Sequence, residues 1–171
     1  MRIRAVTLLT ALVTVGMLVV GASSAEAKST PKAAACSGST KSAATKQIKA
    51  AYDYFLNGTT KPPRTNAQRE AYIAGMSDPA LAALFEKGFG ANAAAAATTN
   101  VKVSAVTCTN KTTASVKADL VISGKVLPGV FPNPGSAVIE NGVWKAGKLT
   151  FCDLTALSDS TVTQSGPCSV Q

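Results

Sequence analysis

Helical periodicity marks the part of the chain that follows residue 41. Apolar side chains recur every three or four positions at Ala44, Ile48, Ala51 and Phe55, which is the spacing of one face of an α-helix. The pair Asn57-Gly58 interrupts the pattern with residues that end helices. The sequence therefore predicts a helix from residue 42 to this pair.

Two shorter helices are predicted from their start signals. Thr65 and Gln68 have the spacing of a capping box, which opens a helix that ends near Gly75. Asp78 followed by Pro79 combines an N-cap residue with a proline at the first helical position. The apolar face of the helix that follows consists of Leu81, Leu84 and Phe85. The alanine-rich tract 91–97 either extends this helix or forms a linker, and periodicity does not decide between the two.

From Thr98 onward the apolar period changes to two. Apolar and polar residues alternate over 101–105 and again over 114–122, which predicts two β-strands. Residues 124–135 contain three prolines and three glycines and are expected to form a loop. The segments 137–140 and 143–152 flank Asn141-Gly142, the strongest short hairpin signal. We therefore expect four strands in an antiparallel meander.

Together these elements predict an α+β domain, with N-terminal helices packed on a four-stranded antiparallel sheet. The domain is expected to span 41–157. Residues 28–40 are small, polar and basic, and we interpret them as a flexible leader. Residues 158–171 form a polar C-terminal tail that returns to Cys168.

Residues 1–27 have the layout of a secretory signal peptide. Arg2 and Arg4 precede an uncharged apolar segment, 5–20, and Ala25-Glu26-Ala27 forms an A-x-A cleavage site. The apolar segment is shorter than the roughly 20 residues that span a bilayer. We therefore expect a secreted, extracellular protein whose mature chain has no transmembrane segment.

Four cysteines, an even number in a chain predicted to be exported, indicate two disulfides. In the predicted meander Cys108 and Cys152 end strands at opposite edges of the sheet, far beyond the roughly 7 Å that a disulfide allows between Cα atoms. Direct pairing of these two is disfavoured. The other two connectivities stay open, and we prefer Cys36 with Cys108 and Cys152 with Cys168, so that Cys152 fixes the tail to the last strand.

The composition argues against several kinds of chemistry. The chain has no histidine and no C-x-x-C spacing, so we expect no metal site and no cofactor. Without a base of near-neutral pKa, nucleophilic catalysis of the Ser-His-Asp or Cys-His kind is disfavoured. The formal net charge of +8 and the lysine-rich leader suit a solubilising tail or contact with an anionic cell-envelope component. With few aromatic residues and no recognisable motif, nucleic acid is not an expected partner.

The order of several motifs resembles a known family. A helix ending in AYDYFLNG is followed by DPALAALFEKGF, a hairpin, a proline-rich loop and NGVWKAGKLTFC. This order is similar to that of small exported actinobacterial proteins with a nuclear-transport-factor-two-like (cystatin-like) fold, and within them to the mycobacterial low-molecular-weight secreted antigen family. The resemblance implies a curved sheet that wraps helices into a cone with an open end. Some relatives with this cone are isomerases or dehydratases that commonly use a histidine or paired aspartates, whereas many exported ones have no established activity.

Six residues are candidates for a pocket or a contact surface: Glu70, Tyr52, Tyr72, Trp144, Val130 and Phe131. Glu70 is the one carboxylate expected to face inward, although an exposed acid near the start of its helix is the simpler interpretation. The tyrosines either line a pocket mouth or cover core, and Trp144 either stacks a ligand or belongs to the core. Val130 and Phe131 lie in a loop that is more apolar than solvation requires, so it packs on the sheet or contacts a partner.

These observations favour a secreted, non-catalytic domain that binds a partner or a small apolar ligand. Two alternatives remain. One is a pocket enzyme of the isomerase or dehydratase type that uses Glu70 with tyrosine hydroxyls. The other is a cationic protein that associates with the cell envelope through its lysines.

Overall fold

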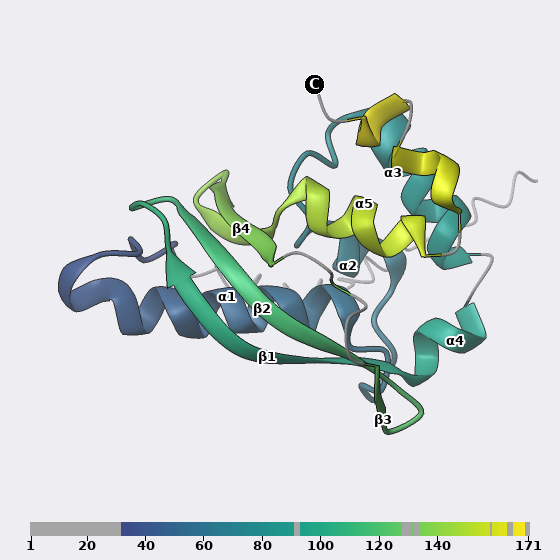
Figure 1. Ribbon diagram of the computed structural model, residues 1–171, viewed down its shortest axis with the longest axis horizontal. Helices are drawn as coiled ribbons and strands as arrows, with labels where there is room; N and C mark the ends of the chain where they lie inside the picture. Colours follow the sequence, from purple (N-terminus) through teal and green to yellow (C-terminus); the bar gives the residue numbers. More distant parts are fainter. Residues whose placement is uncertain are drawn as a thin grey trace, which may run out of the picture.

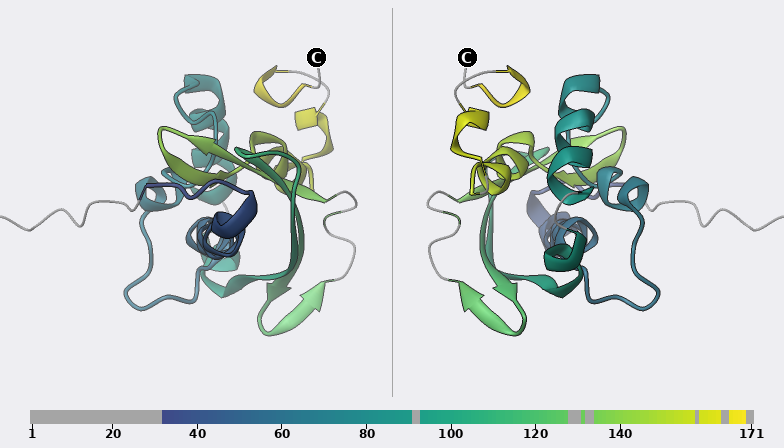
Figure 2. Two further views of the ribbon diagram at one scale, coloured as in Figure 1. Left: turned by 90° about the vertical axis from the view of Figure 1, so that its left-hand side faces the viewer. Right: turned by 90° about the vertical axis from the view of Figure 1, so that its right-hand side faces the viewer.

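The computed structural model describes residues 32–90, 93–127, 131, 134–157, 159–163 and 166–169. Helices precede a curled antiparallel sheet that forms a half-barrel around the first long helix (Figures 1 and 2). The predicted α+β class is confirmed. The predicted signal peptide lies outside the described residues. The helices are η1 (Gly38–Thr40), α1 (Lys41–Leu56), α2 (Asn66–Glu70), α3 (Pro79–Phe85), η2 (Glu86–Gly90, a π-helix), α4 (Ala93–Thr98), α5 (Lys148–Ala156), η3 (Ser160–Thr163) and η4 (Gly166–Cys168).

Helix α1 provides the centre of the core. Its four apolar positions Ala44, Ile48, Ala51 and Phe55 are all buried, as the periodicity predicts. The view along α1 in Figure 2 shows the sheet curling around this helix, and α1 contacts both β1 and β5. The concave face of the sheet therefore covers the apolar face of α1.

The predicted start signals of the two short helices are confirmed. The Thr65 hydroxyl accepts from the Gln68 N–H at 3.2 Å and the Gln68 side chain accepts from the Thr65 N–H at 2.9 Å, which completes the capping box. Asp78 Oδ1 accepts from the Ala80 N–H at 2.9 Å at the start of α3. The part of the alanine-rich tract that the structure describes is helical, since it forms α4.

The described strands form one antiparallel sheet with the order β1-β2-β4-β5, and β3 pairs with β2 beside this path. The four main strands of the predicted meander are present. The short β3 was not predicted, because it lies inside the segment that its prolines and glycines mark as a loop. The strands are β1 (Thr99–Cys108), β2 (Thr113–Ile122), β3 (Lys125–Leu127), β4 (Gly135–Glu140) and β5 (Val143–Ala146).

The hairpin of β4 and β5 turns at Asn141-Gly142, as predicted. Both residues have positive φ values, 53° and 75°, which a two-residue turn of this kind requires. The prediction that the last strand continues to Cys152 was wrong. Strand β5 ends at Ala146, and the chain turns into α5 at Gly147.

Contacts distant in sequence explain this change of structure. A Cβ on Gly147 would lie 2.0 Å from the Ser136 Oγ, so a larger residue would displace the Ser136 hydroxyl. One turn into α5, the buried Thr150 hydroxyl accepts from the Ser136 N–H at 2.9 Å and lies 3.2 Å from the Tyr52 hydroxyl. Phe151 and Thr155, four residues apart, are buried on the same face of α5. A helix thus replaces the second half of the strand that we expected after the Asn141-Gly142 turn.

The described part of the predicted leader is bound to the domain. Ala33 N–H donates to Gly142 O at 2.7 Å, and Cys36 N–H donates to Lys111 O at 2.9 Å. The disulfides are Cys36–Cys108 and Cys152–Cys168, which is the preferred connectivity. The first joins the leader to the end of β1, and the second joins the tail to α5, a helix rather than the strand that we expected.

Candidate functional site

Two of the candidate residues belong to the core. Tyr52 is fully buried, and its hydroxyl donates to Ser136 O at 2.8 Å. Burial raises the pKa of Tyr52 well above its ordinary value, so the phenol stays protonated at physiological pH. Trp144 is also buried, and its indole Nε1 donates to Ala34 O at 2.8 Å. Both side chains support the fold, and neither lines the pocket described below.

Glu70 and Tyr72 lie on another part of the surface. Glu70 is half-buried, and burial together with the nearby Glu86 carboxylate raises the pKa of Glu70 above its ordinary value. The Tyr72 ring stacks on the Tyr54 ring with 4.4 Å between centroids, and the Arg64 guanidinium lies 4.2 Å from the Tyr54 centroid. The structure therefore does not bring Glu70 and the tyrosines together in one cavity.

Of the two candidate residues in the proline-rich loop, the structure describes one. Val130 lies outside the described residues. Phe131 is half-buried and packs against the main apolar core. For Phe131, packing on the domain is therefore the interpretation that the structure favours over an exposed contact.

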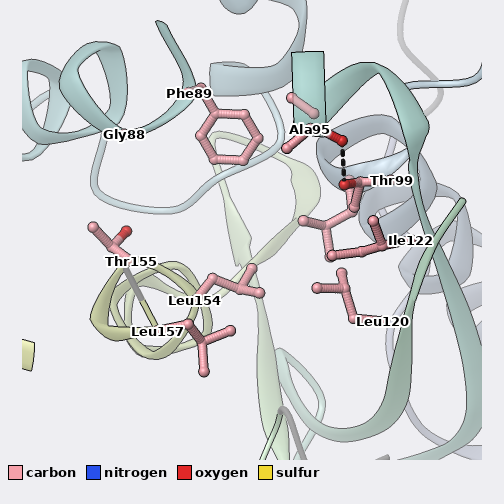
Figure 3. A pocket seen from close by; sticks show the side chains of 11 residues that line it. Gly88, Phe89, Ala95, Thr99, Leu120, Ile122, Leu154, Thr155 and Leu157 are labelled. Atoms are coloured by element: carbon pink, nitrogen blue, oxygen red, sulfur yellow. Dashed lines mark hydrogen bonds between the residues drawn. The ribbon is translucent and has the colours of Figure 1, made fainter. Parts of the chain in front are cut away.

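An apolar pocket of about 210 Å³ lies where α1, α4, α5 and the end of the sheet meet. Figure 3 shows Leu120 and Ile122 of β2 directed toward Leu154 of α5, with Phe89 and Ala95 on the opposite side of the space. The pocket lies at the end of the half-barrel where β1 begins and β2 ends. The residues that line the apolar pocket are Leu56, Gly88, Phe89, Ala95, Ala96, Thr99, Leu120, Ile122, Leu154, Thr155 and Leu157.

Each wall of the apolar pocket follows from a local pattern. On β2, Leu120 and Ile122 project from the same face because side chains alternate along a strand. Leu154 of α5 and Leu157, which caps the end of this helix in αR conformation, are three residues apart and lie on one side. Phe89 is held by stacking on Phe85, with ring centroids 4.5 Å apart.

The hydroxyl groups in the apolar pocket are engaged with backbone. Thr99 Oγ1 donates to Ala95 O at 2.8 Å, and Thr155 Oγ1 donates to Phe151 O at 3.0 Å. None of the described residues that line the pocket carries a titratable side chain. The pocket can therefore remove apolar surface from water, but these residues offer it no general acid or base.

Sequence reasoning missed this pocket because its walls come from separate elements. Leu154 and Leu157 were assigned to the region after the last strand, and α4 was left undecided. The available signal was weak: Phe151, Leu154 and Leu157 recur every three residues, but the apolar residues of α5 are not gathered on one face of the helix.

A family model described as "Low molecular weight antigen MTB12, C-terminal domain" matches residues 40–162. The chain belongs to this family. Residues 40–162 of this MTB12-family protein cover the long helix, the sheet and α5, and thus every wall of the apolar pocket. The search of curated proteins and the search of solved structures found no match.

Both disulfides of this MTB12-family protein cross the boundaries of the matched segment. Cys108 and Cys152 lie inside residues 40–162, whereas their partners Cys36 and Cys168 lie outside them. The disulfides therefore attach the flanking segments to the matched domain. They are compatible with a secreted protein, since such bonds persist in oxidising compartments.

Two further findings concern other classes of site. Within the described part of the chain, no group of three or more histidine, cysteine or acidic side chains is arranged to hold a metal ion. Among the same residues, no helix combines the length and the apolar character that a bilayer crossing requires.

Proposed function

We propose that this protein is a secreted, non-catalytic domain that binds a small apolar ligand in the apolar pocket. The composition of the pocket wall carries the proposal. The 11 lining residues have apolar side chains, apart from one glycine and two threonines whose hydroxyls donate to backbone oxygens. Burial of apolar ligand surface is therefore the main driving force that this wall provides.

The volume of the pocket limits the size of the ligand. At about 210 Å³ it is smaller than the roughly 300–1,000 Å³ of sites for drug-sized molecules. A short alkyl chain or a single ring fits this space, and a long acyl chain would extend beyond it.

Secretion is the second part of the proposal. It is supported by the signal-peptide layout of residues 1–27, by the two disulfides and by membership of a family of low-molecular-weight antigens. A ligand for this pocket would then be taken up outside the cytoplasm.

The proposal is tested with a series of linear alcohols from butan-1-ol to decan-1-ol, measured by displacement of a neutral fluorescent dye. Each methylene that enters the pocket contributes up to about 0.8 kcal/mol, or roughly a fourfold gain in affinity. We expect affinity to rise along the series and to level off once the chain fills the pocket. Failure of every alcohol to bind would contradict the proposal.

Paired variants on α4 locate the binding. Ala95 lines the pocket, whereas the exposed Ala94 on the same helix does not. Ala95→Phe should fill the space and weaken octan-1-ol binding at least tenfold, because the added ring takes the volume of the ligand. Ala94→Phe makes the same chemical change outside the pocket and should bind as the wild type does. Equal effects of the two variants would place the binding elsewhere.

The enzyme alternative gains no support from this pocket, because Glu70 is not among its lining residues. We expect Glu70→Gln to leave alcohol affinity unchanged. A turnover that this substitution abolished would revive the isomerase or dehydratase hypothesis.

A second candidate function, association with an anionic envelope polymer, is favoured by the surface of α1. Lys41, Lys46 and Lys49 are all exposed on this helix. Binding to an anionic polysaccharide such as dextran sulfate should weaken steeply as salt rises, and replacement of the three lysines by glutamine should reduce it further. Binding that is insensitive to both changes would remove this candidate.

A further inference from the structure

The pocket-facing side of the sheet continues from β2 onto the short strand β3. Leu120 pairs with Leu127, and Ile122 pairs with Lys125, in antiparallel register. Residues directly opposite each other in such a pair project from the same face, with Cβ atoms about 4.5–5.5 Å apart. Because Leu120 and Ile122 line the apolar pocket, Leu127 and Lys125 lie on that same face of the sheet.

The turn between β2 and β3 fixes this register. Ser123 and Gly124 both have positive φ, 51° and 78°, which is the geometry of a tight two-residue hairpin turn. The Ser123 N–H also donates to Thr98 O at 3.0 Å, which ties the turn to the end of α4. A slip of one residue would move Lys125 to the other face, and the turn prevents it.

Lys125 lies at the solvent-exposed edge of the pocket-facing side of the sheet. Its side chain is exposed, and Leu127 beside it is 38% exposed. Across the pocket Leu157 is 56% exposed. A lysine places its ammonium in water while its four-carbon stem covers apolar surface. The rim next to Ile122 therefore combines apolar contact with a positive charge.

Two charged side chains, Lys87 and Asp153, lie next to residues of the other pocket walls. Lys87, next to Gly88, lies 4.0 Å from Asp159 in an exposed ion pair. Asp153 precedes Leu154 on α5 and is rotated from it by about 100° around the helix axis. Among the described residues, no carboxylate forms an ion pair with Lys125.

We propose that the ligand of the apolar pocket is an anionic amphiphile, with a short apolar chain inside the pocket and a single anionic head group at Lys125. This inference rests on the proposed function, since it requires that the pocket bind an apolar chain. It adds the chemical class of the ligand and the direction in which the ligand lies. The chain points toward Leu154 and Phe89, and the head group lies toward the turn at Ser123.

Three probes with the same chain and different head groups test the inference: octanoate, octan-1-ol and octylammonium at neutral pH and low salt. We expect octanoate to bind more tightly than octan-1-ol by about two- to fivefold, as an exposed charge pair allows, and octylammonium to bind more weakly than octan-1-ol. Added salt should reduce the advantage of octanoate and leave octan-1-ol unaffected.

Two matched lysine variants assign the head-group contact. Lys125→Gln should abolish the advantage of octanoate while octan-1-ol binds as before. Lys117→Gln removes the same charge from an exposed position on β2 that alternates with Leu120 and so faces the other side of the sheet. It should retain the advantage of octanoate.

The outcomes separate the two proposals. If octan-1-ol binds and all three probes bind equally, the pocket is a neutral apolar site and the inference is overturned while the proposed function stands. If both lysine variants lose the advantage equally, net charge rather than Lys125 selects the head group, and the inference is again overturned. If none of the three probes binds, both proposals fail.

Discussion

Gly58 and Ala96 bring two backbone segments into direct contact. A Cβ placed on Gly58 would lie 1.7 Å from the Ala96 carbonyl oxygen, and the Gly58 N–H donates to Thr99 O at 2.8 Å. The segment after α1 and the end of α4 therefore meet without space for a side chain. This contact determines where α4 lies, and α4 supplies one wall of the apolar pocket.

Gly58→Ala should displace α4. Because backbone atoms block the added methyl group, we expect the free energy of unfolding to fall by about 1–3 kcal/mol, as for other overpacked sites, and octan-1-ol affinity to fall with it. Denaturant unfolding and the dye displacement assay measure the two effects. Gly88→Ala is the control for the unfolding measurement, since its Cβ would meet only the Thr155 Cγ2, at 3.9 Å. Gly88 lines the pocket itself, so this control is not used for ligand affinity. Equal losses of stability in both variants would refute the explanation.

The two disulfides should differ in what they stabilise. Their cysteines are separated by 72 residues for Cys36–Cys108 and by 16 for Cys152–Cys168. The chain-entropy model assigns about 4 kcal/mol to the first and about 3 kcal/mol to the second. The double serine variant of the first pair should therefore lose more stability in thermal unfolding. The variant of the second pair should lose more ligand affinity, because Cys152 is on the helix that carries Leu154.

Glu140 should make the protein sensitive to acid. Burial alone would raise the pKa of Glu140, but hydrogen bonds from the Lys145 ammonium at 2.7 Å and the Gly75 N–H at 2.8 Å hold it below its ordinary value of 4.5. A depressed pKa in the folded state stabilises the protein above pH 4.5, and this contribution disappears as the pH falls through the folded-state pKa.

Glu140→Gln should therefore cost about 1–2 kcal/mol at neutral pH, with a difference from wild type that shrinks on acidification. Denaturant titrations at a series of pH values measure this difference. A constant difference across the series would show that the carboxylate charge is not responsible.

Glu70 should have the opposite effect. The raised pKa of Glu70 means that its charged form is disfavoured in the folded protein, so the penalty is present above the folded-state pKa and is absent below the ordinary value of 4.5. Glu70→Gln should stabilise the protein at neutral pH by less than about 1 kcal/mol, and the gain should disappear on acidification. Destabilisation at neutral pH would contradict this prediction.

Arg69 is a buried cation that closes the C-terminal end of α1. It is only 5% exposed, and its guanidinium donates to Phe55 O at 3.0 Å. Arg69→Met should cost about 1–3 kcal/mol, because it leaves a buried carbonyl without its donor. Arg69→Lys keeps the charge near the end of the helix and should restore part of this loss. Denaturant unfolding measures both variants, and equal stability of Arg69→Lys and Arg69→Met would contradict this prediction.

The features that could be predicted from the sequence are those set by neighbouring residues. The capping box at Thr65, the N-cap at Asp78 and the turn at Asn141-Gly142 each depend on a few consecutive residues, and each is confirmed. The long helix was predictable for a related reason, because sixteen residues repeat one pattern several times.

Features that depend on distant contacts could not be predicted. Helix α5 is fixed by the close approach of Gly147 to Ser136 and by the hydroxyl of Thr150 near Tyr52. Those partners are distant in sequence, so the strand expected after the Asn141-Gly142 turn was extended too far, to Cys152. The apolar pocket was missed for the same reason, since no single segment contains enough of its wall to reveal it.

Because hydrogen bonds hold the leader on α1, they determine which side of the domain would face a surface to which the protein is attached by its amino-terminal end. The Gln47 amide donates to Lys32 O at 3.2 Å, and the pocket residue Leu56 lies more than two turns further along α1, roughly 14 Å at 1.5 Å per residue. The C-terminal tail instead packs on α5, as Figure 1 shows, and this helix supplies Leu154 to the pocket. Attachment through the amino-terminal side would leave the mouth of the pocket open to the medium, whereas attachment through the tail would bring the surface close to it.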